Sequence, residues 1–235
     1  MKNTIPLIGL LLLLPLSAAA QKSIAKREIE QINRTYEQLT QLRLELDYEM
    51  YATHTSSKAI DKQQAVYSRN GDAVFYRLGP MEMLTTSAFS IAADHEGKEL
   101  VVGKAQQQAM NHRLGTDLDA FLQACDTVLI SYPAPGLCLL QLDVEMPDVE
   151  RVELCFVAMS KMLRKVTLYY REVSDWEEGK AETKARMEIT YRRQDSKPDF
   201  AKDLFLTERF IQKNNGVLVP SPAFRDYELH DNTRF

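Results

Sequence analysis

Residues 44–51 read Leu-Glu-Leu-Asp-Tyr-Glu-Met-Tyr, and this alternation decides the fold class. All even-numbered positions of the stretch are apolar, and three of its four odd-numbered positions are acidic. A period of two places the apolar side chains on one face of a β-strand and the charged side chains on the other. Antiparallel sheets commonly bury one face and leave the other in water. The stretch therefore predicts a strand of a sheet that is covered on one side.

The segment that precedes this strand has a different period. Within residues 23–42, Ile29, Ile32, Tyr36 and Leu39 recur at intervals of three and four, among Lys, Glu, Gln and Arg. That spacing predicts an amphipathic helix. No Gly or Pro occurs between residues 23 and 71, so we expect the helix to run almost directly into the strand.

The rest of the chain is mostly β-like. Asn70-Gly71 lies between two β-rich runs, 65–68 and 73–78, which indicates a tight hairpin. Short helices are expected at 106–114 and 117–122. Further strands are expected at 81–86, 89–93, 100–102, 140–146, 152–156, 166–170, 187–191, 204–211 and 224–229.

These elements define an α+β fold class. The sum is roughly ten strands, mostly antiparallel, each with a single apolar face. We therefore predict a large curved antiparallel sheet, an open half-barrel, with the N-terminal amphipathic helix and the short helices packed on one face.

The N-terminus has the three parts of a secretory signal peptide. Lys2 is basic, residues 5–16 are almost wholly apolar, and residues 17–20 have the small side chains that signal peptidase accepts. We expect cleavage before Gln21, which removes residues 1–20 and leaves 21–235 as a single domain. The alternative is an uncleaved anchor, but the apolar run is shorter than the roughly 20 residues that span a bilayer. We expect an exported, periplasmic and soluble chain without a transmembrane span.

Composition narrows the classes of partner. The formal net charge is −4 and the basic residues are interspersed with acidic ones, which argues against nucleic acid as a partner. The three cysteines, Cys125, Cys138 and Cys155, form no C-x-x-C motif. They are expected either as buried thiols or with a Cys138–Cys155 disulfide, and both alternatives remain open.

No motif in the sequence identifies a reaction. The histidines lack the spacing of metal ligands, and neither a nucleophile elbow nor a glycine-rich phosphate loop occurs. Asp47 and Glu49 share one face of a strand at a separation that glycosidases use, although solvated charge is the simpler interpretation. We predict no catalytic residue, no metal and no cofactor, and therefore a protein that is not an enzyme.

The predicted apolar face is the more informative feature. Methionine is flexible and fills irregular spaces, which suits a cavity for a lipid chain. The alternative is that these residues are simply core beneath the helices. Besides Leu44, the candidate ligand-binding residues are Leu46, Tyr48, Met50, Met81, Met83, Phe89, Ile91, Leu168, Tyr170, Met187 and Ile189.

Particular stretches resemble the LolA-like family of periplasmic carriers of outer-membrane lipoproteins. The helix followed by a long strand over residues 24–50 is similar to the start of that family's fold. Residues 89–102 resemble its strand, Gly-Lys turn and strand, and residues 152–156 with 163–168 resemble a later pair of strands. The resemblance implies an open half-barrel closed by helices, with an apolar cavity for acyl chains.

The sequence thus supports two functions. The first is a non-enzymatic periplasmic carrier or binding protein that holds a lipid or an acylated ligand in an apolar cavity. The alternative is a protein-interaction or assembly component of a bacterial cell-envelope machine, with an envelope protein as partner. Fold alone does not choose between them.

Overall fold

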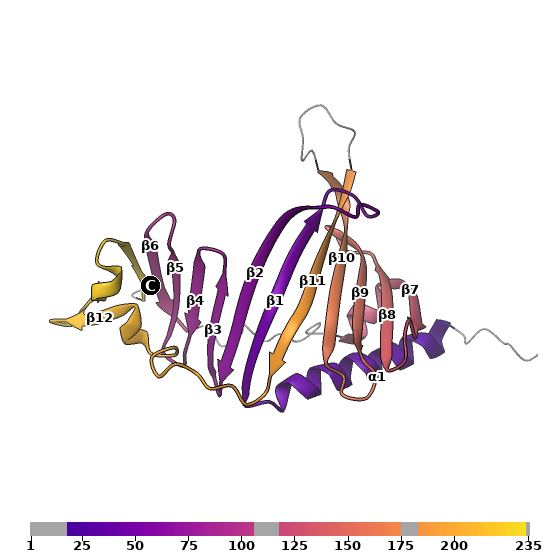
Figure 1. The fold of residues 1–235 in the computed structure, drawn as a ribbon, viewed down its shortest axis with the longest axis horizontal. Coiled ribbons are helices and arrows are strands. Elements are labelled where there is room, and N and C mark those ends of the chain that lie inside the picture. Colours follow the sequence, from indigo (N-terminus) through magenta and orange to yellow (C-terminus); the bar gives the residue numbers. More distant parts are fainter. Residues whose placement is uncertain (1–17, 106–117, 175–182, 234–235) are drawn as a thin grey trace, which may run out of the picture.

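The structure is a computed structural model that describes residues 18–105, 118–174 and 183–233. The predicted signal sequence up to residue 17 and the helix predicted at 106–114 lie outside these residues. Twelve strands form one sheet in the order β14-β6-β5-β4-β3-β2-β1-β11-β10-β9-β8-β7 (Figure 1). The fold is α+β, with a large and mostly antiparallel sheet that does not close into a barrel, as the alternation predicts.

The sheet consists of two halves, each continuous along the chain. The first half contains β1 (Gln41–Tyr51), β2 (Ala59–Asn70), β3 (Ala73–Leu78), β4 (Met81–Thr85), β5 (Phe89–Asp94) and β6 (Glu99–Lys104). The second half contains β7 (Cys125–Ser131), β8 (Leu137–Val144), β9 (Val149–Val157), β10 (Leu163–Ser174) and β11 (Thr183–Asp195). The halves join where β1 pairs with β11, and β14 (Glu228–Asn232) adds to β6 as a parallel strand.

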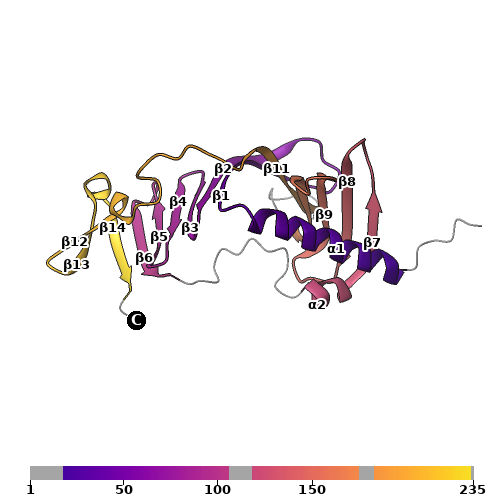
Figure 2. The ribbon, with the colours of Figure 1, turned by 90° about the horizontal axis from the view of Figure 1, so that it is seen from below.

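Helix α1 (Ala18–Glu37) covers the second half of the sheet from the concave side (Figure 2). Ala25, Ile29 and Ile32 are almost completely buried against a cluster that includes Leu140 and Leu154. The short helix α2 (Leu118–Gln123) lies beside α1. These contacts confirm the predicted amphipathic stripe, because its apolar residues face the sheet.

The C-terminal strap, which we define as residues 196–227, covers the first half from the opposite, convex side. It contains η1 (Thr207–Arg209), the hairpin of β12 (Ile211–Asn214) and β13 (Val217–Pro220), and η2 (Pro222–Phe224). Phe210 and Phe224 pack on Phe75, Leu84 and Ile91. The sheet is therefore covered on one face in one half and on the other face in the other half.

Three sequence predictions need correction. Helix α1 begins and ends five residues before the predicted 23–42, and Arg69 binds the carbonyl oxygens of Tyr36 and Leu39 at its C-terminus. Strand β7 was not predicted, because Val128, Leu129 and Ile130 are consecutive apolar residues and show no alternation. The strands expected at 204–211 and 224–229 are instead the turns and short strands of the strap and β14.

No helix among the described residues is long and apolar enough to cross a bilayer.

Candidate ligand-binding surface

The concave face of the first half carries a row of apolar side chains across four strands. Leu44 on β1 is opposite Tyr67, which is opposite Tyr76, which in turn is opposite Met83 on β4. Residues directly opposite in antiparallel strands share a face. The row therefore continues across the sheet beyond the region that α1 covers.

A second group of predicted residues extends this surface to the centre of the sheet. Tyr48 and Met50 on β1 are opposite Ile189 and Met187 on β11. Met187 is in turn opposite Leu168 on β10, and the Tyr170 hydroxyl lies 4.0 Å from the Met187 sulfur. The structure therefore brings together nine of the predicted side chains on one face: Leu46, Tyr48, Met50, Met81, Met83, Leu168, Tyr170, Met187 and Ile189.

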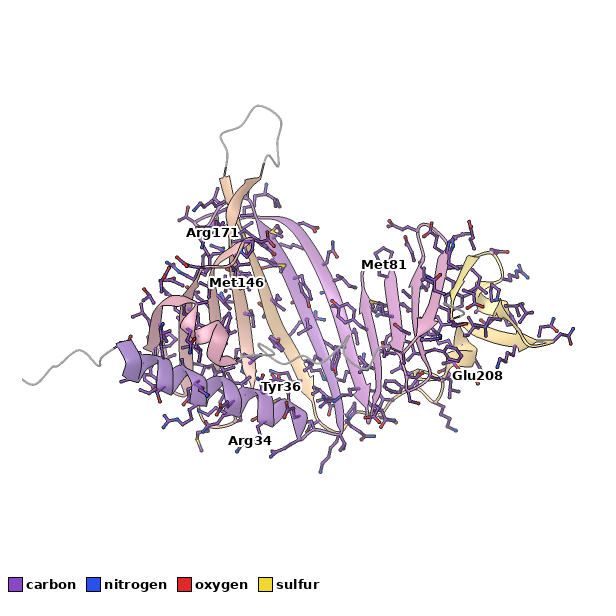
Figure 3. The ribbon with its side chains drawn as sticks, turned by 180° about the vertical axis from the view of Figure 1, so that it is seen from behind. Arg34, Tyr36, Met81, Met146, Arg171 and Glu208 are labelled. Carbon is purple, nitrogen blue, oxygen red and sulfur yellow. The ribbon has the colours of Figure 1, made fainter. Side chains whose placement is uncertain are left out.

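Burial distinguishes the centre of this surface from its periphery. Leu46 is buried at 6% exposure, whereas Tyr48, Met50, Met83 and the other central residues are only partly buried. Met81, at the β3–β4 turn, is 37% exposed (Figure 3). The concave face thus presents these apolar side chains, most of them partly exposed, and we call the nine residues together the concave apolar surface.

Phe89 and Ile91 do not belong to this surface. Met83 is opposite Ala92, so Ile91 and Phe89 point to the convex face. There Ile91 is completely buried, and Phe89 packs at the edge of the same cluster under the strap. The sequence prediction of one shared face is therefore wrong for these two residues, because alternation within each strand does not set the register between strands.

Tyr36 anchors the C-terminal end of α1 to the sheet, at the border of the concave apolar surface. Its hydroxyl donates to Gln194 Oε1 at 2.7 Å and accepts the Leu163 backbone N–H at 3.0 Å. The Gln194 amide donates to the Leu163 carbonyl at 2.5 Å, which completes a ring of hydrogen bonds. Burial raises the pKa of Tyr36 to about 12. The hydrogen bond from the Leu163 N–H lowers this pKa, but its effect is smaller than that of burial.

Other contacts hold the body of α1 against the second half of the sheet. Lys161, in the β9–β10 turn, forms an ion pair with Glu28, and both side chains are mostly buried. The Thr35 hydroxyl also lies 3.5 Å from the Ser160 carbonyl oxygen. The position of α1 therefore depends on specific polar contacts as well as on its apolar face.

The polar groups on this face include the phenols of Tyr48 and Tyr76, and also the exposed side chains of Gln63 and Asp61, which are opposite Tyr48 and Met50. The Tyr76 and Tyr48 hydroxyls are 3.4 Å apart. Burial raises the pKa of Tyr76 and of Tyr191 far above the ordinary value. These hydroxyls can orient a polar end of a ligand, while the methionine and leucine side chains around them offer apolar contact.

Tyr76 and Leu78 lie on the same face as the nine residues of this surface but were absent from the predicted set. A signal for them was available in the Asn70-Gly71 hairpin. A tight turn at this point makes Tyr67 and Tyr76 partners across β2 and β3, as the structure has them.

The other sequence candidates have separate places and partners. Asp47 and Glu49 lie on the convex face, where Gln64 donates to Asp47 at 3.2 Å and Lys62 binds Glu49. They are not among the residues that line the pocket described below. Within the described residues, no group of His, Cys, Asp and Glu side chains could hold a metal ion.

The cysteines are all free thiols in the structure. Cys138 is opposite Phe156 in the core beneath α1, whereas Cys155 is opposite Leu139 on the other face of the sheet. A disulfide between them would have to cross the sheet. Of the two alternatives, the structure has the free thiols, and burial raises the pKa of each.

Neither a protein-family model nor a curated protein matches this sequence.

Solved structures resemble its fold. One is a conserved protein from Thermus thermophilus, with 7% identity over 89% of this chain and 99% of that chain, and a TM-score of 0.49. Another is the MucA/MucB complex of Pseudomonas aeruginosa, with 12% identity over 84% of this chain and 63% of that chain, and a TM-score of 0.45. A LolA superfamily protein from Nitrosomonas europaea has 8% identity over 79% of this chain and 99% of that chain, and a TM-score of 0.35.

A LolA superfamily protein is thus among the solved structures that this chain resembles in fold. Each TM-score lies below 0.5, and the function of this chain is therefore argued from its own residues.

Proposed function

We propose that this protein is a non-enzymatic carrier or binding protein of the periplasm that holds a lipid or an acylated ligand against the concave apolar surface. The observation that carries the proposal is the set of partly exposed apolar side chains on the concave face, with Met50, Met83 and Met187 among them. Methionine adapts its shape to irregular partners, and soluble chains normally bury such a continuous apolar group.

The physical basis of binding is the burial of methylene groups. Each CH₂ group removed from water contributes about 0.8 kcal/mol, so an acyl chain gains useful affinity without a directional contact. The Tyr76 phenol, whose pKa is raised by burial, and the neighbouring Tyr48 hydroxyl can accept or donate a hydrogen bond at a polar end of the ligand. No catalytic group is required for this role.

Native mass spectrometry of the protein purified from a bacterial periplasm without detergent tests the proposal. We expect excess mass that organic solvent extracts as lipid, together with displacement of a fluorescent fatty acid from the delipidated protein. A bare polypeptide mass combined with the absence of fatty-acid binding would contradict the carrier function.

Two variants locate the binding surface. Met83→Glu places a charge on the concave apolar surface and should weaken fatty-acid binding strongly, because burying an unpaired carboxylate is costly. Met159→Glu is the matched control, since Met159 is 94% exposed in the β9–β10 turn. Equal loss of binding in both variants would place the ligand elsewhere.

A second function, as a protein-interaction or assembly component of a cell-envelope machine, is favoured by the edge of the sheet. Strand β7 is the last strand of the second half, and Leu129 on it is 45% exposed. Tyr132, directly after the strand, is 73% exposed. An edge with such side chains can accept a strand from a partner.

Pull-down from an envelope extract separates this function from the first. Leu129→Lys should release a partner captured through β7 but leave fatty-acid binding unchanged. Retention of the partner by Leu129→Lys would exclude docking at this edge.

A further inference from the structure

A pocket of about 290 Å³ lies on the convex side, between the first half of the sheet and the C-terminal strap. The sheet contributes Arg43, Val66, Ser68, Phe75, Arg77 and Glu82. The strap contributes Ala201, Asp203, Leu204 and Arg209. The pocket is thus on the opposite face from the concave apolar surface and independent of the function proposed for it.

Strand register explains how these polar groups meet. Arg43 on β1 is opposite Ser68 on β2, which is opposite Phe75 on β3. In the adjacent row, Arg77 on β3 is opposite Glu82 on β4. The floor of the pocket therefore consists of two neighbouring rows on one face of the sheet.

The floor contains buried hydrogen-bonding groups without a protein partner. Ser68 is completely buried, and its hydroxyl makes no hydrogen bond within the described residues. The Nε of Arg43 is also buried and also makes no hydrogen bond within the described residues. It lies 3.8 Å from Glu45 Oε1, which is too far for a hydrogen bond. Buried polar groups are almost always paired, so two unpaired groups in one pocket point to a ligand that accepts hydrogen bonds.

The charges indicate which kind of ligand fits. Arg209 is committed to Glu82, with Nη2 2.7 Å from Oε2, and it also lies over the Phe75 ring. Arg77 forms no ion pair with any described residue and is exposed at the pocket.

Arg43 shares its acidic neighbours with other arginines. Glu45 lies near Arg43 and within 3.9 Å of Arg192 and Arg193, and Asp195, opposite Arg43 on β11, lies 3.8 Å from Arg193. The excess of positive charge is therefore in the lining of the pocket itself, where three arginines accompany two carboxylates, Glu82 and Asp203.

We propose that this pocket binds a small oxyanion, which is a carboxylate or a phosphate group, through the guanidinium groups of Arg43 and Arg77 and the hydroxyl of Ser68. Guanidinium forks match the oxygens of both groups, and a serine hydroxyl adds a third donor. Asp203 on the strap side limits the total negative charge that the pocket accepts. The volume is sufficient for a small molecule and too small for an extended chain.

Isothermal titration of the purified protein with inorganic phosphate and with acetate, each against chloride at matched ionic strength, tests the proposal. Binding of phosphate alone supports a phosphorylated ligand, binding of acetate alone supports an organic acid, and binding of both supports a general oxyanion site. If neither anion produces a heat of binding or raises the melting temperature of the protein, the proposal is wrong.

Variants assign the binding to this pocket. Ser68→Ala and Arg43→Gln should each weaken the anion by about tenfold, since each removes a hydrogen-bond donor to a charged group. Ser68→Ala should not lower the melting temperature, because it removes a buried hydroxyl that has no protein partner among the described residues. Arg225→Gln is the control, since its side chain is 80% exposed and does not line the pocket. Equal weakening by the control would show nonspecific charge attraction and refute the site.

Discussion

The two halves of the sheet are built from the same alternation but are covered from opposite sides. In the second half, α1 packs aliphatic side chains on the concave face and polar contacts fix its position. In the first half, the strap packs aromatic side chains on the convex face, with Phe210 and Phe224 at its centre. The covering element, and not the strand pattern, decides which face of each half is buried.

This difference explains both candidate sites. Where the strap covers the convex face, the concave face of the same strands keeps apolar groups such as Tyr76 and Met83 partly exposed. Where the strap crosses the polar side of β1 and β2, it encloses Arg43 and Ser68. One site thus lies on an apolar face that neither α1 nor the strap covers, and the other lies where the strap covers a polar face.

The largest expected effect is on the half that the strap covers. Phe210→Ala should lower the free energy of unfolding by about 3–5 kcal/mol, because it removes a completely buried ring from that core. Amide hydrogen exchange should accelerate in β3–β6 more than in β8–β10. Uniform acceleration across the sheet would show that the halves are not separable.

The complementary change is in the half that α1 covers. Ile29→Ala should cost about 2–4 kcal/mol, since Ile29 is 1% exposed beneath α1 and alanine leaves a cavity. Here exchange should accelerate in β8–β10. An equal loss of amide protection in β3–β6 would show that the two halves of the sheet do not unfold separately.

A smaller effect is expected at the ring of hydrogen bonds around Tyr36. Tyr36→Phe should cost about 1–2 kcal/mol at neutral pH, because the Leu163 N–H loses its acceptor. Urea unfolding measures this change, and a variant as stable as the parent would show that the ring does not contribute.

The pH dependence of the same variant checks the assignment. The pKa of Tyr36 is raised from 10.0 to about 12, so the neutral phenol contributes stability that is complete below pH 10 and is lost as the pH approaches 12. Tyr36→Phe should therefore lose less stability than the parent over this range. If the free energies of unfolding of the variant and of the parent fell in parallel between pH 10 and pH 12, this would contradict the burial of the phenol.

The smallest effect is expected on the convex face of the centre, which neither element covers. The Lys62 ammonium lowers the pKa of Glu49 by a hydrogen bond, with a further contribution from the Tyr51 hydroxyl. Because Lys62 is 66% exposed, solvent screens the pair, and Lys62→Gln should cost at most about 0.5 kcal/mol. Because the pKa of Glu49 is depressed, this contribution is present at neutral pH and is lost on acidification. Thermal unfolding at neutral and acidic pH measures it.

The fold class was accessible from the sequence because alternation is local. The pattern of residues 44–51 predicted β1, and the spacing of Ile29 and Ile32 predicted the buried stripe of α1. The strap was not accessible in the same way. Phe210 and Ile211 are adjacent and both buried, which a period of two cannot produce.

The candidate site was only partly accessible for a related reason. Met50 and Met187 could be assigned to a shared face, since each lies in a strand with clear alternation. The assignment of Ile91 failed because its face depends on the hairpin register that pairs Met83 with Ala92. The oxyanion pocket could not be predicted, because Ser68 and Arg209 are far apart in sequence and meet only when the strap docks.

The seam between β1 and β11 has a consequence for the order in which the strands can pair when the chain emerges N-terminus first. The chain has to be synthesised as far as residue 195 before β1 can acquire its second neighbour, although β2–β6 can pair with it much earlier. The N-terminal hairpins must therefore wait with one bare edge while more than half of the polypeptide emerges, and pairing across such a long sequence separation is slow. A chain of this architecture is vulnerable along that edge until β11 has emerged, and a chaperone that shields unpaired strands would have its main effect there.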